Sequence, residues 1–160
     1  MKVLVFSDTH GYCYHMVRVI EEEAPSCVIH LGDCTNDAEE LHRHFPMLPV
    51  LSVRGNCDYG DHITQDSAIS DFDGIRVLSS HGHKYGVKGS LLRFLMAAKE
   101  NAVHVALFGH THCAYCENVD GIWLMNPGSC GYTTRATYGV LEITDHAAAC
   151  IIKTVKENIT

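Results

Sequence analysis

Five short polar motifs in the sequence contain residue types that bind divalent metal ions. They are Asp8-Thr9-His10, Gly32-Asp33, Gly55-Asn56-Cys57-Asp58, His81-Gly82-His83 and Gly109-His110-Thr111-His112. Carboxylate oxygen, amide oxygen and imidazole nitrogen together suit borderline ions such as Mn, Fe, Co, Ni or Zn, whereas Mg and Ca prefer cages of oxygen alone. The motifs therefore predict a site for borderline divalent ions.

The spacing within two of these motifs supports the same interpretation. In an extended chain, residues i and i+2 point to the same side, so Asp8 with His10, and His110 with His112, can each reach one centre. A lone histidine is more often a hydrogen-bonded structural residue than a ligand. We expect that structural role for His30, His42, His44, His62, His104 and His146.

Alternating apolar runs and helical patterns must position the motifs. In the first half we expect strands over 3–6, 27–31 and 50–53 and helices over 12–23 and 37–45. This order is typical of a parallel sheet with crossover helices. Four motifs follow an apolar strand directly, and the fifth follows Leu78-Ser79-Ser80. Because ligands gather beyond the carboxyl ends of strands in such sheets, the five motifs should meet at one edge.

Antiparallel pairs dominate the second half. Hairpins are predicted around Asp73-Gly74, Asp120-Gly121 and Asp145-His146, with strands over 68–72, 75–79, 114–118, 122–125, 138–143 and 149–155. A helix over 90–101 and a strand over 103–108 lie between them. We therefore expect two sheets packed face to face with helices outside, as one domain over residues 1–160 without linkers or repeats.

Composition excludes several classes of protein. The 160 residues are the usual size of one domain. The formal net charge of -7 argues against non-specific binding of a nucleic-acid polymer, which needs a basic face. The apolar runs are far shorter than the roughly 18 residues that a membrane span needs. The 12 histidines equal lysine and arginine combined, which also favours a metal site.

The 8 cysteines do not indicate a disulfide scaffold, because a chain of this size needs no covalent staple. Residues 1–6 are too short an apolar run for a signal peptide, so we expect a reducing cytoplasm. Cys34, Cys57 and Cys113 each follow a candidate ligand directly. We favour small packing residues over oxidation-sensitive thiols at these positions.

The joint order Asp-x-His, Gly-Asp, Gly-Asn-x-Asp, His-Gly, Gly-His-x-His resembles the calcineurin-like metallophosphoesterase superfamily. The short length, Gly55-Asn56-Cys57-Asp58 and Asn126-Pro127-Gly128-Ser129 resemble its small bacterial and archaeal phosphodiesterase branch. The resemblance covers nearly the whole chain. It implies an α/β fold, a four-layer α/β/β/α sandwich of two mixed β-sheets flanked by helices, with a two-metal site.

The resemblance also implies a role for each ligand. One ion would be held by Asp8, His10 and His112, the other by Asn56, His81 and His110, and Asp33 would bridge both. The implied activity is that of a metal-dependent phosphodiesterase, a phosphoric ester hydrolase that attacks small phosphodiesters with a metal-bridging hydroxide. Mn²⁺ is the favoured ion, with Fe, Zn, Ni or Co as alternatives.

Four further residues are candidates for catalysis. Cys57 stands where many relatives have a histidine that protonates the leaving group, and a thiol with a pKa of about 8.5 is its expected substitute. His83 is an alternative acid, and Asp58 would hold the turn or orient its neighbours. Arg54 would either clamp the substrate phosphate or pair with a surface carboxylate, and both alternatives stay open. We expect a preference for acidic leaving groups, as in aryl diesters.

Three other functions compete with this interpretation. Some proteins of this fold, such as a retromer subunit, are protein-binding scaffolds, but they have lost ligands that are all present here. A nuclease would need a basic groove, and a phosphomonoesterase would prefer monoesters. The expected partner is a small phosphodiester, with no nucleic-acid polymer and no membrane. Pairing of hairpins such as 114–125 into a homo-oligomer is left open.

Overall fold

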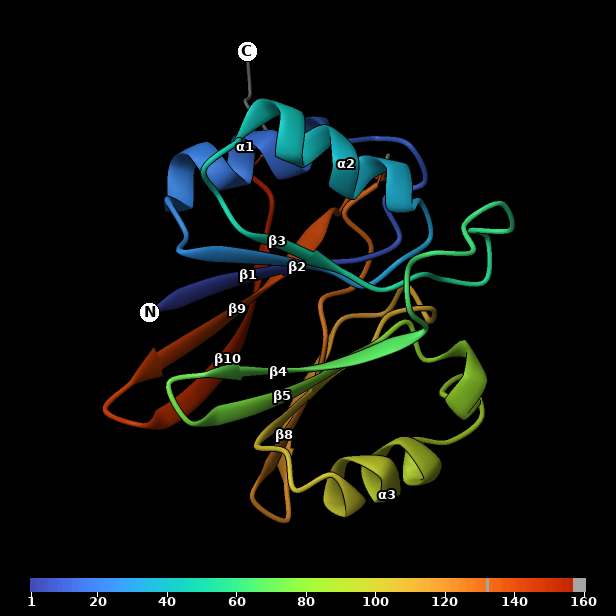
Figure 1. Ribbon diagram of the computed structural model, residues 1–160, viewed down its shortest axis with the longest axis vertical. Helices are drawn as coiled ribbons and strands as arrows, with labels where there is room; N and C mark the ends of the chain where they lie inside the picture. The colour runs from blue at the N-terminus through green and yellow to red at the C-terminus, as the bar shows by residue number, and fades with distance from the viewer. Residues whose placement is uncertain (132, 157–160) are drawn as a thin grey trace.

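The computed structural model describes residues 1–131 and 133–156, so residues 132 and 157–160 of the expected domain lie outside the described residues. Within the described part, the strands form two five-stranded sheets. Two helices lie above the first sheet and one lies below the second, as Figure 1 shows. The predicted α/β/β/α sandwich of two mixed sheets is confirmed.

The first sheet has the strand order β10-β9-β1-β2-β3. Its strands are β1 (Lys2–Phe6), β2 (Cys27–His30), β3 (Val50–Ser52), β9 (Thr137–Thr144) and β10 (Ala147–Thr154). β1, β2 and β3 are parallel, whereas β9 is antiparallel to β1 and to β10. β2 is buried along its whole length, as expected for a parallel strand covered on both faces. Helices α1 (Tyr14–Glu23) and α2 (Thr35–His44) connect the parallel strands.

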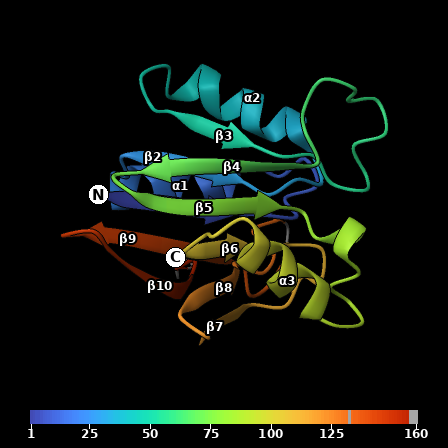
Figure 2. The ribbon, with the colours of Figure 1, turned by 60° about the horizontal axis from the view of Figure 1, so that its bottom comes forward.

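The second sheet has the order β4-β5-β6-β8-β7. Its strands are β4 (Ser67–Phe72), β5 (Ile75–Ser80), β6 (Val105–Leu107), β7 (Tyr115–Val119) and β8 (Ile122–Asn126). β5, β6 and β8 are parallel, and the hairpins place β4 and β7 antiparallel at the two edges. Helix α3 (Leu92–Glu100) covers its outer face, and a short 3₁₀ helix η1 (His83–Tyr85) follows β5 (Figure 2).

Three buried apolar clusters separate the four layers. Val5, Leu107 and Met125 belong to the central cluster between the sheets. A second cluster includes Met16 and Leu41 of α1 and α2 against the first sheet, and a third includes Phe94 of α3 against the second. The sheets therefore share one core, and their polar strand ends are held in a fixed relation.

The observed elements differ from the predicted ones by a few residues at their ends: the strand predicted over 103–108 is only Val105–Leu107, and the strand predicted from 149 begins at Ala147. α1 begins at Tyr14 and α3 at Leu92, each two residues later than expected, whereas α2 begins at Thr35 instead of Asp37. The early start of α2 has a tertiary cause, because the Asp58 carboxylate accepts the amides of Cys34 and Thr35. None of the helices in the described residues has the length and apolar character that a membrane span requires.

Candidate metal centre

The structure brings the seven predicted ligand residues to one edge where the two sheets meet. The first sheet supplies Asp8 and His10 after β1, Asp33 after β2 and Asn56 after β3; the second supplies His81 after β5 and His110 and His112 after β6. All of these positions lie beyond the carboxyl ends of parallel strands, where such folds concentrate ligand-binding residues. Neither sheet alone carries the full set.

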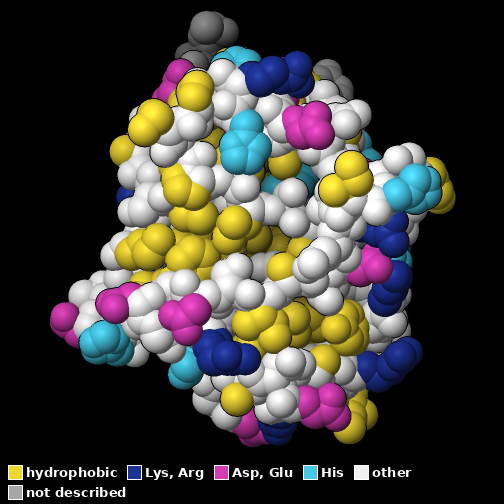
Figure 3. All heavy atoms as spheres, in the orientation of Figure 1, with side chains coloured by type: hydrophobic (Ala, Val, Ile, Leu, Met, Phe, Trp, Pro, Cys, Tyr) yellow, Lys and Arg dark blue, Asp and Glu magenta, His cyan; other side chains and the backbone are white. Residues whose placement is uncertain are grey.

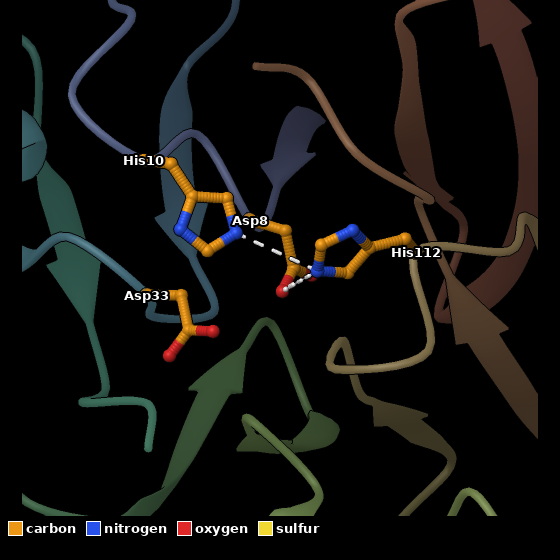
Figure 4. A group of neighbouring side chains, drawn as sticks. All are labelled: Asp8, His10, Asp33 and His112. Carbon is orange, nitrogen blue, oxygen red and sulfur yellow. Dashed lines mark hydrogen bonds and ion pairs between the residues drawn. The ribbon is translucent and has the colours of Figure 1, made fainter. Parts of the chain in front are cut away.

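Four of these residues form a compact donor group (Figure 4). Asp8, His10, Asp33 and His112 each offer one ligand atom, and these atoms all lie within 4.8 Å of one another. Nε2 of His10 lies 3.5 Å from Nε2 of His112, which in turn lies 3.1 Å from Oδ1 of Asp8. Imidazole nitrogens bind zinc-like ions at about 2.0–2.1 Å, so nitrogens this far apart can share one ion.

A second group adjoins the first through Asp33. Nε2 of His81 lies 3.1 Å from Oδ1 of Asn56 and 3.4 Å from Oδ2 of Asp33. The ring of His110 lies against that of His81, with centroids 5.1 Å apart. The Asp33 carboxylate therefore lies between both groups, as a bridging ligand would.

The hydrogen bonds around Asp8 fit a cation at this position. Oδ2 of Asp8 accepts hydrogen bonds from Ser7 Oγ at 2.7 Å and from the His110 amide at 3.1 Å. Oδ1 is buried and accepts no hydrogen bond from a described residue, and its contacts with Nε2 of His112 at 3.1 Å and Nε2 of His81 at 3.8 Å are ion pairs only when those rings are protonated. A buried carboxylate oxygen without a hydrogen bond is costly, and a bound cation would remove that cost. The mixed oxygen and nitrogen donors fit a borderline divalent ion.

The tautomer of His81 also suits a ligand. Its Nδ1 lies 2.8 Å from the Leu31 carbonyl oxygen, which can only accept a hydrogen bond, so Nδ1 carries the proton. In the neutral ring Nε2 carries the lone pair. It faces Asn56 and Asp33, and the carboxylates of Asp33 and Asp8 raise the pKa of His81 against the effect of burial, so a cation at Nε2 would take the place of a proton. Metal-binding histidines usually donate their other ring nitrogen to a carbonyl or carboxylate in this way.

Five of the candidate ligands have a strained backbone conformation, which also occurs at turns such as Ala24 and Asp73. Asp8, His10, Asp33, His110 and His112 have left-handed φ values between 50° and 68°. This conformation costs a non-glycine residue about 1–2 kcal/mol. Such strain persists where the surrounding structure enforces it and is common at functional sites. The backbone turns therefore direct these side chains toward the candidate metal centre, and the strained conformation lowers local stability.

Asp58 organises the loops beneath the centre. Its carboxylate accepts four backbone amides: Asp33 at 3.0 Å, Cys34 at 2.8 Å, Thr35 at 2.9 Å and Gly55 at 2.7 Å. These bonds tie the loop after β2 to the loop after β3. Asp58 thus holds the turn, which is the structural role considered for it from the sequence.

Cys57 and His83, the two candidates for the proton donor, both lie beside the centre. Cys57 is exposed, and its amide donates a 2.9 Å hydrogen bond to Oδ1 of Asp33. Partial burial and the Asp33 carboxylate raise the pKa of its thiol. The His83 ring lies 5.5 Å from that of His81, and burial lowers the pKa of His83. Which of the two protonates a leaving group stays a prediction.

Arg54 is engaged by the carboxylate of Asp66 and by the backbone carbonyl of Asp61. Its Nε lies 2.8 Å from Oδ1 of Asp66, and its Nη1 donates a 2.7 Å hydrogen bond to the Asp61 carbonyl. Hydrogen bonds from Arg54 and Lys84 lower the pKa of Asp66 to about 2. Of the two alternatives open from the sequence, the carboxylate pair is therefore the one present in the structure.

Cys34, Cys57 and Cys113, which each follow a candidate ligand, do not all serve as buried packing residues. Cys57 and Cys113 are exposed, so small apolar filling does not account for them. Sγ of Cys34 lies 3.2 Å from Oδ1 of Asp37, and burial with that carboxylate raises the pKa of Cys34 to about 11. This shift is opposite to that of an activated thiol.

Sequence reasoning missed several residues that support the centre. Nδ2 of Asn126 donates to the Gly109 carbonyl and lies 2.9 Å from Thr111 Oγ1, while Ser129 Oγ donates a 2.9 Å hydrogen bond to the Asp8 carbonyl. Buried His30, expected to be structural, lies 2.9 Å from Thr9 Oγ1. Their positions in the sequence could have indicated this supporting role. Ser7 and Thr9 flank Asp8, and Asn126 and Ser129 belong to the motif Asn126-Pro127-Gly128-Ser129.

Comparisons with known proteins agree with this geometry. Residues 1–146 match the model of the calcineurin-like phosphoesterase superfamily domain. The probable metallophosphoesterase YsnB of Bacillus subtilis is 34% identical over 131 residues, which cover 81% of this chain and 75% of that protein. The phosphodiesterase MJ0936 of Methanocaldococcus jannaschii is 30% identical, with 89% of this chain and 93% of that protein covered. A solved structure of a predicted phosphoesterase from Streptococcus pneumoniae has the same fold, with a TM-score of 0.77 and 22% identity over 96% of this chain and 88% of that one.

Proposed function

Because the chain belongs to the calcineurin-like phosphoesterase superfamily, we propose that it is a phosphodiesterase that hydrolyses small phosphodiesters with two divalent metal ions. The observation that carries this proposal is the position of Asp33 between two donor groups, each of which combines residues from both sheets. A shared carboxylate can hold two ions at the separation of about 3.5–4 Å that two-metal hydrolases use.

The proposed ligands follow the two groups. Asp8, His10 and His112 would hold one ion, Asn56, His81 and His110 would hold the other, and Asp33 would contact both. Mn²⁺ is the favoured ion, with Fe, Zn, Ni or Co as alternatives, because the donors are mixed oxygen and nitrogen. When bound, divalent ions at such a site lower the pKa of a water molecule and neutralise charge on phosphoryl oxygens.

The protein contributes orientation and a proton. Ser7 and the His110 amide hold the Asp8 carboxylate, and Leu31 holds the His81 ring, so the ligands are oriented before substrate binds. Cys57 is exposed beside the centre, and its thiol, whose ordinary pKa is about 8.5, can donate a proton to the departing oxygen. A thiol is a weak acid, which favours substrates with acidic leaving groups.

A small diester is the substrate class with most support. MJ0936, a relative with 30% identity, is named a phosphodiesterase. The cleft beside His10, about 850 Å³ in volume and lined by Glu39, Asp58 and Asp61, contains no lysine or arginine among its described lining residues. That lining does not suit the backbone of a nucleic-acid polymer.

The free thiols of all eight cysteines fit the reducing cytoplasm that we propose as its location.

A metal-by-substrate screen tests the proposal. Chelator-treated protein is reloaded with Mn²⁺, Fe²⁺, Co²⁺, Ni²⁺, Zn²⁺ or Mg²⁺ and assayed with bis(p-nitrophenyl) phosphate, p-nitrophenyl phosphate and an oligonucleotide. We expect the diester to be hydrolysed fastest, with Mn²⁺ as the best ion. Faster hydrolysis of the monoester would indicate a phosphomonoesterase, and cleavage of the oligonucleotide would indicate a nuclease.

A protein-binding scaffold is the second candidate, and one surface feature favours it. Hydrophobic side chains gather over the face that carries β3 and β4 (Figure 3), where Leu51 and Ile69 are 38% and 42% exposed. Exposed apolar patches often mark protein interfaces. A scaffold would bind its partner with equal affinity with or without metal ions and would hydrolyse none of the three substrates.

A further inference from the structure

A pocket of about 370 Å³ opens beside the candidate metal centre. One wall is formed by Asp8, His10 and His112 of the centre itself. The segment between β8 and β9 also lines the pocket, through Ser129, Gly131, Thr133 and Arg135. A ligand in this pocket can therefore touch the centre and this segment at once.

Arg135 is the one lysine or arginine among the described residues that line this pocket. The side chain is exposed, and no hydrogen bond or ion pair of its guanidinium group is made with a described residue. The backbone is held in place, because the Arg135 amide lies 3.5 Å from Thr133 Oγ1. Arg135 differs in this respect from Arg54, whose guanidinium is engaged by Asp66 and Asp61.

The cationic character continues beyond Thr133. A neighbouring pocket of about 300 Å³ shares Thr133 and is lined by His15, Arg18 and Lys156. Its described lining residues include no aspartate or glutamate. Arg18 is paired with Glu22 at 3.2 Å, so Arg135 and Lys156 are the further positive side chains on this side of the centre, although the protein carries a net charge of -7.

The other pocket that reaches the centre has the reverse charge. The larger cleft, which also reaches His10, is lined by Glu39, Asp58 and Asp61 and has no lysine or arginine in its described lining. A substrate with one more anionic group would be repelled from that cleft and attracted toward Arg135. This difference in charge between the two pockets would orient a substrate that has a second anionic group, with that group toward Arg135.

We infer that the pocket at Arg135 is a second phosphate subsite. While one phosphate of the substrate lies at the metal centre, Arg135 binds a further phosphate group of the same molecule, as guanidinium groups do in bidentate geometry. The Thr133 hydroxyl, which accepts the Arg135 amide, can donate its own proton to that phosphate. The substrate class is a phosphodiester that carries an additional phosphate, so this inference rests on the proposed function and narrows it.

Equilibrium binding tests the subsite without catalysis. Calorimetry compares thymidine 3′,5′-bisphosphate with thymidine 5′-monophosphate on Mn²⁺-loaded protein. We expect the bisphosphate to bind about 10-fold more tightly, as one charge-assisted contact would provide. Arg135→Gln should remove that preference, and Arg135→Lys should retain part of it. The control is Arg93→Gln, an exposed arginine on α3, which should retain all of it.

Kinetics provides the second measurement. The p-nitrophenyl ester of thymidine 5′-phosphate is assayed with and without a 3′-phosphate, so that the leaving group is the same. We expect kcat/KM to be about 10-fold higher for the phosphorylated ester, through a lower KM. Arg135→Gln should lower kcat/KM for the phosphorylated ester about 10-fold more than for the plain ester.

The outcomes separate the two proposals. Equal binding of both nucleotides, or an equal loss for both in Arg135→Gln, would overturn the subsite and leave the phosphodiesterase assignment intact. An Arg135-dependent preference for the bisphosphate in a protein that hydrolyses neither ester would support the subsite and contradict the proposed function.

Discussion

Nδ1 of His81 donates a 2.8 Å hydrogen bond to the carbonyl oxygen of Leu31, and this bond joins the two sheets beside the candidate metal centre. His81 follows β5 in the second sheet, whereas Leu31 follows β2 in the first. The bond therefore sets the ring tautomer and holds the two sheet edges together at the same time. Metal binding and the packing of the sheets should consequently be coupled.

Asp33→Asn should abolish the binding of both ions, because the proposed bridging carboxylate loses its charge. We expect metal content to fall well below that of the wild type and the rate of diester hydrolysis to fall at least about 100-fold. Elemental analysis and p-nitrophenol release measure the two effects. Asp71→Asn, at an exposed position on β4, is the control and should change neither. Full metal content in Asp33→Asn would contradict the bridging role.

Gly109→Ala should distort the Asp8 carboxylate. A Cβ at this position would collide with Ser7 Oγ and lie 2.9 Å from Oδ2 of Asp8. Overpacking of this kind costs about 1–3 kcal/mol in the free energy of unfolding, and we also expect weaker metal binding. Urea denaturation and metal titration measure both quantities. Gly60→Ala is the matched control, because a Cβ there meets no atom within 4 Å.

Asp58→Asn should loosen the loops that carry Asp33 and Asn56. The amide group replaces one carboxylate oxygen, which accepts two backbone amides, with a hydrogen-bond donor that faces them. We expect the free energy of unfolding to fall by about 2 kcal/mol and metal affinity to decrease as well. Chemical denaturation and calorimetric metal titration are the measurements. An unaltered metal affinity would show that Asp58 stabilises the fold without positioning the ligands.

Cys57→His should extend hydrolysis to esters with poor leaving groups. An imidazole is a better general acid near neutral pH than a thiol, and the exposed position has space for the ring. We expect about a 10-fold gain on alkyl aryl diesters with weakly acidic leaving groups and a shallower dependence of rate on leaving-group pKa. Cys57→Ser is the control, since it keeps the size without the acid. Equal or lower rates across the series would argue against Cys57 as the donor position.

Glu23 should make stability depend on acidic pH, far from the metal centre. Hydrogen bonds from Lys153 and Lys2 lower the pKa of Glu23 from 4.5 to about 2. The folded-state pKa is below the unfolded one, so this contribution is full above pH 4.5 and is lost as the pH falls toward 2. We expect a contribution of about 1–2 kcal/mol after allowance for solvent screening.

The measurement is denaturation between neutral and acidic pH. Glu23→Gln should be less stable than the wild type at pH 7, and the difference should shrink as the pH falls through this window. Glu21→Gln, exposed on the same helix, should follow the wild type. A difference between Glu23→Gln and the wild type that stays constant with pH would exclude an ionised Glu23 as its source.

Much of this fold could be predicted because its signals are local. Apolar runs of strand length and turn pairs such as Asp73-Gly74 depend on neighbouring residues, and each predicted hairpin is present. The five motifs were visible for the same reason, since each begins within three residues of the end of a strand. Their convergence followed from a general rule, that the ends of parallel strands share an edge.

Other features depended on contacts between segments far apart in the chain, which local patterns do not encode. Whether Arg54 meets a phosphate or a carboxylate depended on where Asp66 lies, and the first turn of α2 depended on Asp58, more than twenty residues away. No local pattern indicates Arg135 as a binding residue. It becomes a candidate only because the fold places it in the same pocket as Asp8 and His112. The sequence by itself determines the type of each side chain and the local pattern around it. The neighbours of a side chain and its exposure to water are decided only when the two sheets pack together.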